Sequence, residues 1–333
     1  MVALAGSGAA ATLHALAAAR VGAPVVAVAS RRDDHALALA ERVGARPCGY
    51  DELPAGADLV VVATPPGVHL PHVRASADRG ARVLVESPLA TTLADADALV
   101  GVAEADGDVI YGENLAASAI LRRAVQEVRA ISPVHDLEVR ALSPRPERRD
   151  LTDPVWGGGA MLDLGSRAVA LALLLAGDDE PVGVEAELVP STGAAATPGL
   201  DESGRARLRF GSGLVARLEV SWTLPDAVWD LQAAGPTGVV RASLLPDQEL
   251  ERNGEPLRLP DVADHDRDPV VGLGFSSQLI ETGDGDGGAL DAHFGRAVLD
   301  VVCAAYAAAR LGAPVSLPFD GRRDLTPAQL WQG

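Results

Sequence analysis

The sequence predicts an α/β protein, in which a doubly wound parallel sheet is followed by an α+β domain with a mostly antiparallel sheet. Up to residue 111, short apolar runs alternate with Ala-rich helical patterns, which is typical of parallel strands covered by helices. A glycine-rich turn stands between the first apolar run and the first helical pattern. Beyond residue 180, polar and apolar residues alternate, as they do in a sheet with one face in water.

The elements of the first half are predicted from apolar periodicity. Continuous apolar runs indicate buried strands, and they occur at residues 2–5, 25–29, 58–63, 82–85 and 108–111. Segments with helical spacing separate them, at residues 9–20, 33–43, 67–79 and 92–105. Because strands and helices alternate, we expect the strands to run parallel in one sheet.

The second half begins with two helices separated by a long strand. We expect a helix near residues 115–130, a strand over 134–143 and, after the glycines 157–159, an apolar helix over 160–176. Strand patterns bounded by Gly-containing turns follow, at residues 182–190, 204–210, 214–222, 228–234 and 237–244.

The end of the chain completes the predicted organisation. Residues 261–290 are acidic and Gly-rich, which predicts a loop, and a last long helix is expected at 289–311. A chain of this length accommodates two domains of ordinary size. We therefore predict a first domain over residues 1–115 and a second domain over residues 116–333.

The turn after the first strand has the composition of a dinucleotide-binding loop. Gly6 permits a tight turn, Gly8 lets the backbone approach a pyrophosphate, and Ala11 lets the helix pack closely on the strand. The N-terminus of the helix then offers unpaired N–H groups and a positive dipole end to phosphates. We therefore predict a Rossmann domain whose cofactor-binding turn consists of Gly6, Ser7, Gly8, Ala9 and Ala10.

The end of the second predicted strand bears on the choice of dinucleotide. In NAD-preferring folds an acidic residue at this point holds the ribose hydroxyls. Here the strand ends in Ser30-Arg31-Arg32, so that two guanidinium groups stand where a 2′-phosphate would lie. A solvated loop with two surface arginines is the alternative. We predict NADP in preference to NAD, with Ser30, Arg31 and Arg32 as binding residues.

Charge and cysteine content exclude several classes of function. The 333-residue chain has a formal net charge of -18, which argues against nucleic acid and anionic membrane surfaces as partners. It contains no apolar run long enough to span a bilayer and no signal-peptide pattern. Cys48 and Cys303 are the only cysteines, so we expect a cytoplasmic protein without a disulfide framework.

The absence of lysine excludes any mechanism that needs a lysine ammonium group.

Several motifs occur in an order that is typical of one family. Ala63-Thr64-Pro65-Pro66 precedes His69, and Val85-Glu86-Ser87-Pro88-Leu89 ends a predicted strand. Further motifs are Glu113-Asn114, Gly157-Gly158-Gly159, Asp163-Leu164-Gly165 and the closing segment Asp324–Trp331. With the glycine turn, these motifs span nearly the whole chain, and the sequence resembles the Gfo/Idh/MocA family of NAD(P)-dependent oxidoreductases.

The resemblance implies positions for the cofactor and for an oligomer contact. It assigns the cofactor contacts beyond the glycine turn to Thr64, Pro65, His69, Glu86 and Asn114. It also implies a cis peptide bond between Ser87 and Pro88, and a homodimer or homotetramer built on the open face of the second sheet. Taken singly, the histidine and the asparagine could equally cap helices, and the glutamate could be a surface charge.

Two departures from the family pattern lie at residues that would move a proton. The lysine of the family's Glu-Lys-Pro is Ser87 here, and the histidine of its Asp-x-Gly-x-His is Arg167. A guanidinium cannot exchange a proton near neutral pH, because its pKa exceeds ~12. Asp163 can still serve as the acid or base and shares a helix face with Arg167. Arg167 is either the partner in an i,i+4 ion pair or a contact for a carboxylate or phosphate of the substrate.

The sequence therefore predicts an NADP(H)-dependent oxidoreductase for a small polar substrate, such as a sugar derivative or a natural-product intermediate. The candidate catalytic residues are Glu86, Ser87, Asp163 and Arg167, and Tyr111 is a further proton donor in principle. Two alternatives stay open. One is a catalytically degenerate NADP(H)-binding regulatory or accessory protein, and the other is a lyase, epimerase or cyclase that uses bound cofactor without net redox change.

Metal chemistry is not expected. His69 and His72 have no third ligand at a suitable spacing for zinc. Residues 283–288 lack the later ligands and the closing glutamate of a calcium loop, so we expect a flexible acidic loop there.

Overall fold

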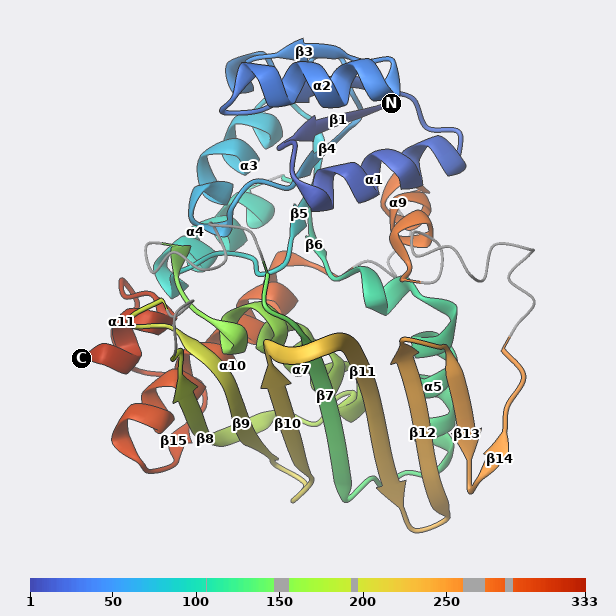
Figure 1. Ribbon diagram of the computed structural model, residues 1–333, viewed down its shortest axis with the longest axis vertical. Coiled ribbons are helices and arrows are strands. Elements are labelled where there is room, and N and C mark those ends of the chain that lie inside the picture. The colour runs from blue at the N-terminus through green and yellow to red at the C-terminus, as the bar shows by residue number, and fades with distance from the viewer. Residues whose placement is uncertain (106, 147–155, 193–196, 260–272, 285–289) are drawn as a thin grey trace. The chain divides into compact units, whose positions relative to one another are not determined.

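The chain forms two units, each of which encloses its own sheet (Figure 1). The computed structural model describes residues 1–105, 107–146, 156–192, 197–259, 273–284 and 290–333. The first unit comprises Met1–Ala90, Ala94–Ser118 and Ala263–Arg296, and the second comprises Thr91–Leu93, Ala119–Val262 and Ala297–Gly333. The late segment Ala263–Arg296 thus belongs to the first unit by packing. The predicted division between residues 115 and 116 assigns that segment to the second domain. The assignment of cofactor and substrate to the two domains stays a prediction.

The first sheet has six parallel strands in the order β3-β2-β1-β4-β5-β6, which is the doubly wound order. The strands are β1 (Val2–Ala5), β2 (Val25–Ala29), β3 (Arg46–Cys48), β4 (Leu59–Val62), β5 (Arg82–Glu86) and β6 (Val109–Gly112). All except β3 coincide, within one residue at each end, with the predicted apolar runs. Those runs predict strands well because side chains on both faces of a parallel sheet are buried.

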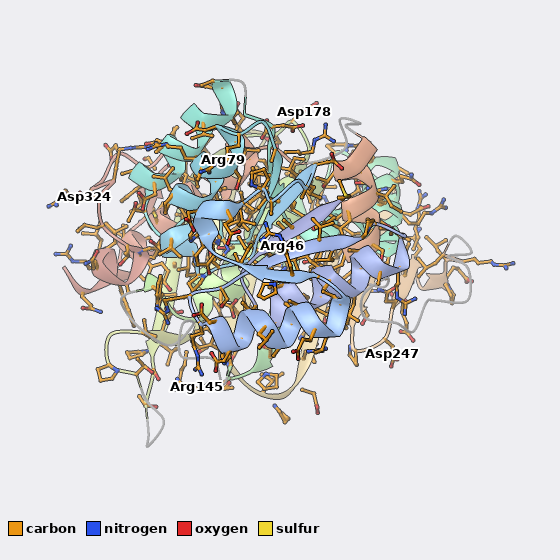
Figure 2. The ribbon with its side chains drawn as sticks, turned by 90° about the horizontal axis from the view of Figure 1, so that it is seen from above. Arg46, Arg79, Arg145, Asp178, Asp247 and Asp324 are labelled. Atoms are coloured by element: carbon orange, nitrogen blue, oxygen red, sulfur yellow. The ribbon has the colours of Figure 1, made fainter. Side chains whose placement is uncertain are left out.

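The edge strand β3 was not predicted because it lacks an apolar run. Its arginine and proline are exposed and its cysteine is half-buried. Pro47 has no N–H to offer at the edge, and Arg46, labelled in Figure 2, donates from Nη1 to Glu52 Oε2 at 2.9 Å. A short strand with a charge and a proline protects a sheet edge from pairing with another chain.

The helices of the first unit follow the prediction except at one position. They are α1 (Ala9–Arg20), α2 (Asp33–Val43), α3 (His69–Ala77), α4 (Leu93–Glu104) and α9 (Phe275–Asp284), with short turns η1 (Tyr50–Glu52), η2 (Pro66–Val68) and η3 (Asn114–Ala117). The loop predicted over residues 261–290 is wrong where α9 occurs. Phe275 and Leu279, four residues apart, are buried in the core of this unit, and α9 packs on α1 (Figure 1).

The second sheet has nine strands in the order β14-β13-β12-β11-β7-β10-β9-β8-β15. They are β7 (Asp136–Pro144), β8 (Pro181–Pro190), β9 (Asp201–Phe210), β10 (Val215–Ser221), β11 (Thr223–Gly235), β12 (Gly238–Leu245), β13 (Glu249–Arg252), β14 (Glu255–Pro256) and β15 (Val315–Ser316). Every neighbouring pair is antiparallel except β7 and β10, which confirms the mostly antiparallel sheet. The strands β13 to β15 are too short to show alternation and were not predicted.

Helices cover one face of this sheet and leave the other open. The long helices of this part of the chain are α5 (Ala119–Ala130), α7 (Ala160–Ala176) and α10 (Ala292–Leu311), and α11 (Pro327–Gln332) is short. The helix predicted over 115–130 is divided into η3 and α5. Helix α5 packs on β11, β12 and β13, and α7 packs on β7, β9 and β10. In the described parts of the chain, no helix has the length and apolar character that crossing a membrane requires.

A buried polar cluster fixes the start of α7. Tyr306 donates its hydroxyl to Asp201 Oδ1, and the backbone N–H of Met161 donates to Asp201 Oδ2 at 2.7 Å. The backbone N–H of Gly159 donates to the Tyr306 hydroxyl at 3.1 Å. A Cβ on Gly159 would collide with Asp201, so glycine is required at this approach. The cluster satisfies donors that a helix N-terminus leaves unpaired.

Burial raises the pKa of Asp201 to about 6, although the hydrogen bonds from Tyr306 and the Met161 N–H oppose that shift. In the unfolded chain the same carboxyl has its ordinary pKa of about 4. Between these two values the folded protein keeps a proton that the unfolded chain has lost. Raising the pH through this range therefore destabilises the folded state.

We predict that the free-energy difference of unfolding between wild type and Asp201→Asn depends on pH. The substituted amide cannot ionise, so the wild type should lose stability relative to the variant as the pH rises from about 4 to about 6, by on the order of 2–3 kcal/mol. Urea unfolding at a series of pH values measures this difference. A difference that stays constant, or that grows in favour of the wild type with pH, would contradict the assignment.

Candidate functional site

The glycine turn brings two central strands of the first sheet into close backbone contact. Gly6 has a φ of 125°, a conformation that favours glycine, and a Cβ on it would collide with the carbonyl oxygen of Ala63. Its N–H donates to Ala29 O at 2.8 Å, at the end of β2. The turn thus joins the carboxyl ends of β1, β2 and β4, where a doubly wound sheet binds its ligand.

The start of α1 is suited to an anion. Gly8 is the N-cap, no side chain caps the helix, and its first turn has no acidic residue. Gly8 and Ala9 are exposed, whereas Ala11 is fully buried against the sheet. The first N–H groups of a helix have no intrahelical partner, so the turn presents donors without a competing carboxylate. The residues present therefore fit the diphosphate of a dinucleotide.

Side chains at the end of β2 lie beside this turn. Ser7 Oγ donates to Ser30 Oγ at 2.8 Å, which ties the glycine turn to the predicted ribose position. Arg32 forks onto Asp34, with Nε to Oδ1 at 3.2 Å and Nη2 to Oδ2 at 2.7 Å. Both arginines, Arg31 and Arg32, are exposed. Both arms of the Arg32 guanidinium fork are therefore engaged by one carboxylate, in an exposed pair that contributes little to stability.

An aromatic pair stands next to the same strand end. The ring of Tyr50 stacks on His72 with centroids 4.1 Å apart and an interplanar angle of 26°. Burial raises the pKa of Tyr50. Hydrogen bonds of its hydroxyl with the Arg31 backbone and the Ser30 side chain oppose that shift. The imidazole of His72 therefore packs as a flat ring against Tyr50.

His69 connects the ends of β4 and β5 inside the first unit. It is 1% exposed, with Nδ1 3.0 Å from Leu89 O and Nε2 2.9 Å from Thr64 O. Burial lowers the pKa of His69, although the two carbonyl oxygens and Glu86 oppose the shift. A neutral imidazole has one N–H, so it donates to one carbonyl at a time. Both ring nitrogens face backbone, which makes the residue a brace between two strand ends.

Glu86 is buried rather than a surface charge. It is 5% exposed, and its Oε1 lies 2.5 Å from Nε2 of His14, which is fully buried in α1. Phe275 of α9 packs its ring edge to face with His14, with centroids 5.0 Å apart. The pair links the helix after the glycine turn to the end of β5. Removing one partner of such a buried pair is destabilising.

Ser87, the first residue after β5, has a hydroxyl partner. Ser87 Oγ and the Tyr111 hydroxyl lie 2.8 Å apart, and Tyr111 is 1% exposed. The peptide bond between Ser87 and Pro88 is cis, as the resemblance implies. Asn114 is buried and donates from Nδ2 to Leu273 O at 2.6 Å, so it braces the segment that leads into α9.

Asp163 and Arg167 lie one turn apart on α7, in the second unit. Trp222, between β10 and β11, donates from Nε1 to Asp163 Oδ2 at 3.1 Å. Arg167 Cζ lies 5.6 Å from the centroid of the Trp229 ring, which is a cation–π distance. Both polar side chains of the predicted pair therefore contact an indole.

The predicted residues thus divide between the two units. The turn from Gly6 to Ala10 lies close to Ser30 and Thr64 in the first unit, where Pro65 starts the turn η2. Glu86 and Ser87 belong to the same unit, whereas Asp163 and Arg167 belong to the second. Their roles toward cofactor and substrate stay predictions.

Sequence reasoning missed several side chains that hold these residues. His14 had a visible signal, because it lies at helical spacing with the buried Ala11, Ala15 and Ala18, where a polar side chain needs a partner. Trp222 is conspicuous in a chain with few aromatic residues. Its contact with Asp163 joins residues 59 positions apart, so no local sequence pattern predicts it. The same holds for the pair formed by Asp201 and Tyr306.

The described segments contain no group of three or more histidine, cysteine, aspartate or glutamate side chains that could hold a metal ion. The predicted acidic loop at 283–288 begins within the last turn of α9. Residues 285–289 lie outside the described residues.

Two family profiles match the chain. The profile for the oxidoreductase family with an NAD-binding Rossmann fold (GFO/IDH/MocA) matches residues 1–113, and the profile for the GFO/IDH/MocA C-terminal domain matches residues 121–241. The chain belongs to this oxidoreductase family, as its motifs indicated.

Curated relatives of the chain act on sugars. It is 28% identical over 211 residues to D-xylose 1-dehydrogenase (NADP(+)) 2 of Haloferax volcanii, covering 60% of this chain and 62% of that protein. It is 32% identical over 167 residues to dTDP-3,4-didehydro-2,6-dideoxy-alpha-D-glucose 3-reductase of Streptomyces antibioticus, covering 46% and 49%. The chain therefore spans about half to three fifths of the length of these relatives.

Solved structures share the fold over almost the whole chain. GenD2 from gentamicin A biosynthesis, solved in complex with NAD, is 25% identical and superposes with a TM-score of 0.83, covering 95% of each chain. The likeness confirms the predicted combination of a Rossmann sheet and a mostly antiparallel sheet.

Proposed function

We propose that this protein is an NADP(H)-dependent oxidoreductase that oxidises an alcohol or reduces a carbonyl of a sugar derivative, nucleotide sugars included. The observation that carries the proposal is the uncapped start of α1 beside a glycine that admits no Cβ. Family membership and the names of the curated relatives support the reaction class. When bound, a nicotinamide coenzyme supplies reversible hydride exchange with a carbon of the substrate.

The first unit supplies the residues that would hold the coenzyme. The backbone N–H groups from Gly8 to Ala10 would bind the diphosphate, and Ser7 and Ser30 would line the approach to the ribose. Thr64 and Pro65 follow β4 at the same edge of the sheet. The Thr64 hydroxyl is buried without a hydrogen-bond partner, so it retains capacity for a ligand.

NADP is preferred over NAD in this proposal because of the end of β2. No carboxylate stands at Ser30, and Arg31 and Arg32 are exposed cations next to it. The Arg32 fork is occupied by Asp34, which leaves Arg31 as the stronger candidate for the 2′-phosphate. The xylose dehydrogenase relative is named for NADP, whereas GenD2 was solved with NAD, so the preference needs a direct test.

We predict that Arg31→Ser weakens NADPH binding about 10-fold or more and changes NADH binding less than about 2-fold, because only NADPH carries the 2′-phosphate. Arg32→Ser is the matched control and should weaken NADPH binding less, since its fork already pairs with Asp34. Fluorescence titration of both coenzymes gives the dissociation constants. Tighter binding of NADH than of NADPH by the wild type would refute the preference.

Proton transfer is assigned to Asp163 in this proposal. Arg167 cannot lose its proton near neutral pH, and the chain has no lysine. Arg167 would instead bind an anionic group of the substrate, such as a carboxylate or a nucleotide diphosphate, while its guanidinium stacks on Trp229. The hydroxyl pair of Ser87 and Tyr111 is a second route for a proton within the first unit.

A homo-oligomer is part of the proposal, formed on the open face of the second sheet. That face carries ordered ion pairs, such as Arg140 with Asp230 and Arg205 with Glu219. Because the charges are paired within one copy, a second copy would cover no uncompensated charge, and covering a pair costs less than covering a single charge.

We predict that coenzyme is consumed or formed with a member of a panel of aldoses and dTDP- or UDP-sugars, measured by reduced-nicotinamide absorbance. Asp163→Asn should lower turnover at least about 100-fold while leaving the NADPH dissociation constant unchanged, because it removes only the proton carrier. Tyr111→Phe tests the second route in the same assay.

Other outcomes of this assay distinguish the competing functions. Product without net coenzyme consumption would replace the proposal with a lyase, epimerase or cyclase. Tight coenzyme binding without turnover of any member of the panel would favour the regulatory or accessory protein. Near-normal turnover by Asp163→Asn would refute the role of Asp163 alone.

A further inference from the structure

Two tryptophans contact the polar face of α7. Trp222 is 3% exposed, and its indole N–H donates to Asp163 Oδ2 at 3.1 Å. Trp229 lies in β11 at a break in the register with β12, and the Arg167 guanidinium lies over its ring at a cation–π distance. The indole N–H of Trp229 is buried without a hydrogen-bond partner. Only the first tryptophan therefore uses its N–H on a candidate site residue.

Asp163 is half-buried in the first turn of α7. Helix α7 packs on β10, whose buried residues on the covered face are Ala216, Leu218 and Val220. A half-buried carboxylate loses part of its hydration, so each hydrogen bond that it receives favours its ionised form. Trp222 is a donor that cannot accept, so its hydrogen bond favours the ionised carboxylate over the acid.

Among the described residues, charged and titratable groups occur on α7 itself, at its start, and on α5, which packs on α7 and carries Glu127 paired with Arg123 and Arg252. Arg167 lies on α7, one turn after Asp163. Asp201 and Tyr306 lie at the start of the helix, where they are engaged with each other and with the N–H groups of Met161 and Gly159.

We propose that Trp222 is a positioning residue that orients Asp163 through Oδ2 and keeps it as a carboxylate, so that Asp163 enters the reaction as the proton acceptor of an alcohol oxidation. The inference rests on the proposed function. In that direction the O–H bond of the substrate breaks and its proton goes to Asp163. The C–H bond of the same carbon would break with its electron pair as the C=O bond forms, and the bound oxidised coenzyme would supply the acceptor for that hydride. In reduction the protonated Asp163 returns the proton.

The two tryptophans have different roles toward the two polar side chains of α7. Trp222 acts on the protonation of Asp163, whereas Trp229 acts on the placement of Arg167 through its ring face alone. Replacing either by phenylalanine keeps an aromatic ring and removes an N–H. Trp229→Phe is therefore a matched control for Trp222→Phe, because its N–H has no partner to lose.

Indole NMR tests the contact without any substrate. The chain has four tryptophans, and ¹⁵N-tryptophan labelling gives one indole signal for each. We expect the Trp222 signal, assigned by its loss in Trp222→Phe, to move in one step as the pH is lowered and Asp163 gains a proton. That step should vanish in Asp163→Asn, and Trp229 should show no step that depends on Asp163. A Trp222 signal that is independent of pH, or a step that persists in Asp163→Asn, would overturn the proposal.

The effect on Asp163 itself is measured with ¹³C-labelled aspartate. The Asp163 carboxyl signal is the one missing from Asp163→Asn. We expect its titration midpoint to rise by about one pH unit or more in Trp222→Phe and to stay at the wild-type value in Trp229→Phe. Equal midpoints in the three proteins would overturn the proposal even if Asp163 proves essential for turnover. Conversely, a raised midpoint in an enzyme that tolerates Asp163→Asn would refute the catalytic role and leave the contact intact.

Discussion

The approach of Gly6 to Ala63 is the constraint on which the candidate cofactor site depends. The two backbones meet where β1 and β4 end, and no side chain fits between them. Because the turn is this tight, α1 starts immediately beyond the strand edge, and no side chain caps its first N–H groups. A larger residue would separate the strands and move the helix start, so the geometry for a diphosphate follows from one missing Cβ.

Buried histidines extend this constraint across the first unit. His69 braces the backbone that follows β4 and β5, and His14 connects α1 to Glu86 at the end of β5. Neither imidazole is at the surface. Residues that the family pattern suggests as cofactor contacts therefore serve first to hold strand ends in place, which is the support that a precise binding site needs. Ser87, directly after β5, adds a hydroxyl that lies within hydrogen-bond distance of the Tyr111 hydroxyl.

Sequence patterns predicted the parts of the fold that depend on local periodicity. The apolar runs gave the central parallel strands, and Ala160–Ala176 was predicted to the residue, because apolar burial imposes a period that a single segment displays. The strand β3 and the helix α9 were missed, since the first has no apolar run and the second lies in an acidic, Gly-rich segment. Trp222 and His14, which contact Asp163 and Glu86, are 59 and 72 residues away from them in the sequence. Local periodicity cannot predict contacts over such separations.

The central claim is that the backbone N–H groups at the start of α1 bind the diphosphate of a nicotinamide coenzyme. Isothermal titration calorimetry of the folded protein with NADP⁺, NADPH, NAD⁺ and NADH tests it most directly. We expect saturable heat with one coenzyme per chain, strongest for an NADP form. The absence of heat with all four coenzymes, from protein whose circular dichroism shows it to be folded, would contradict the account.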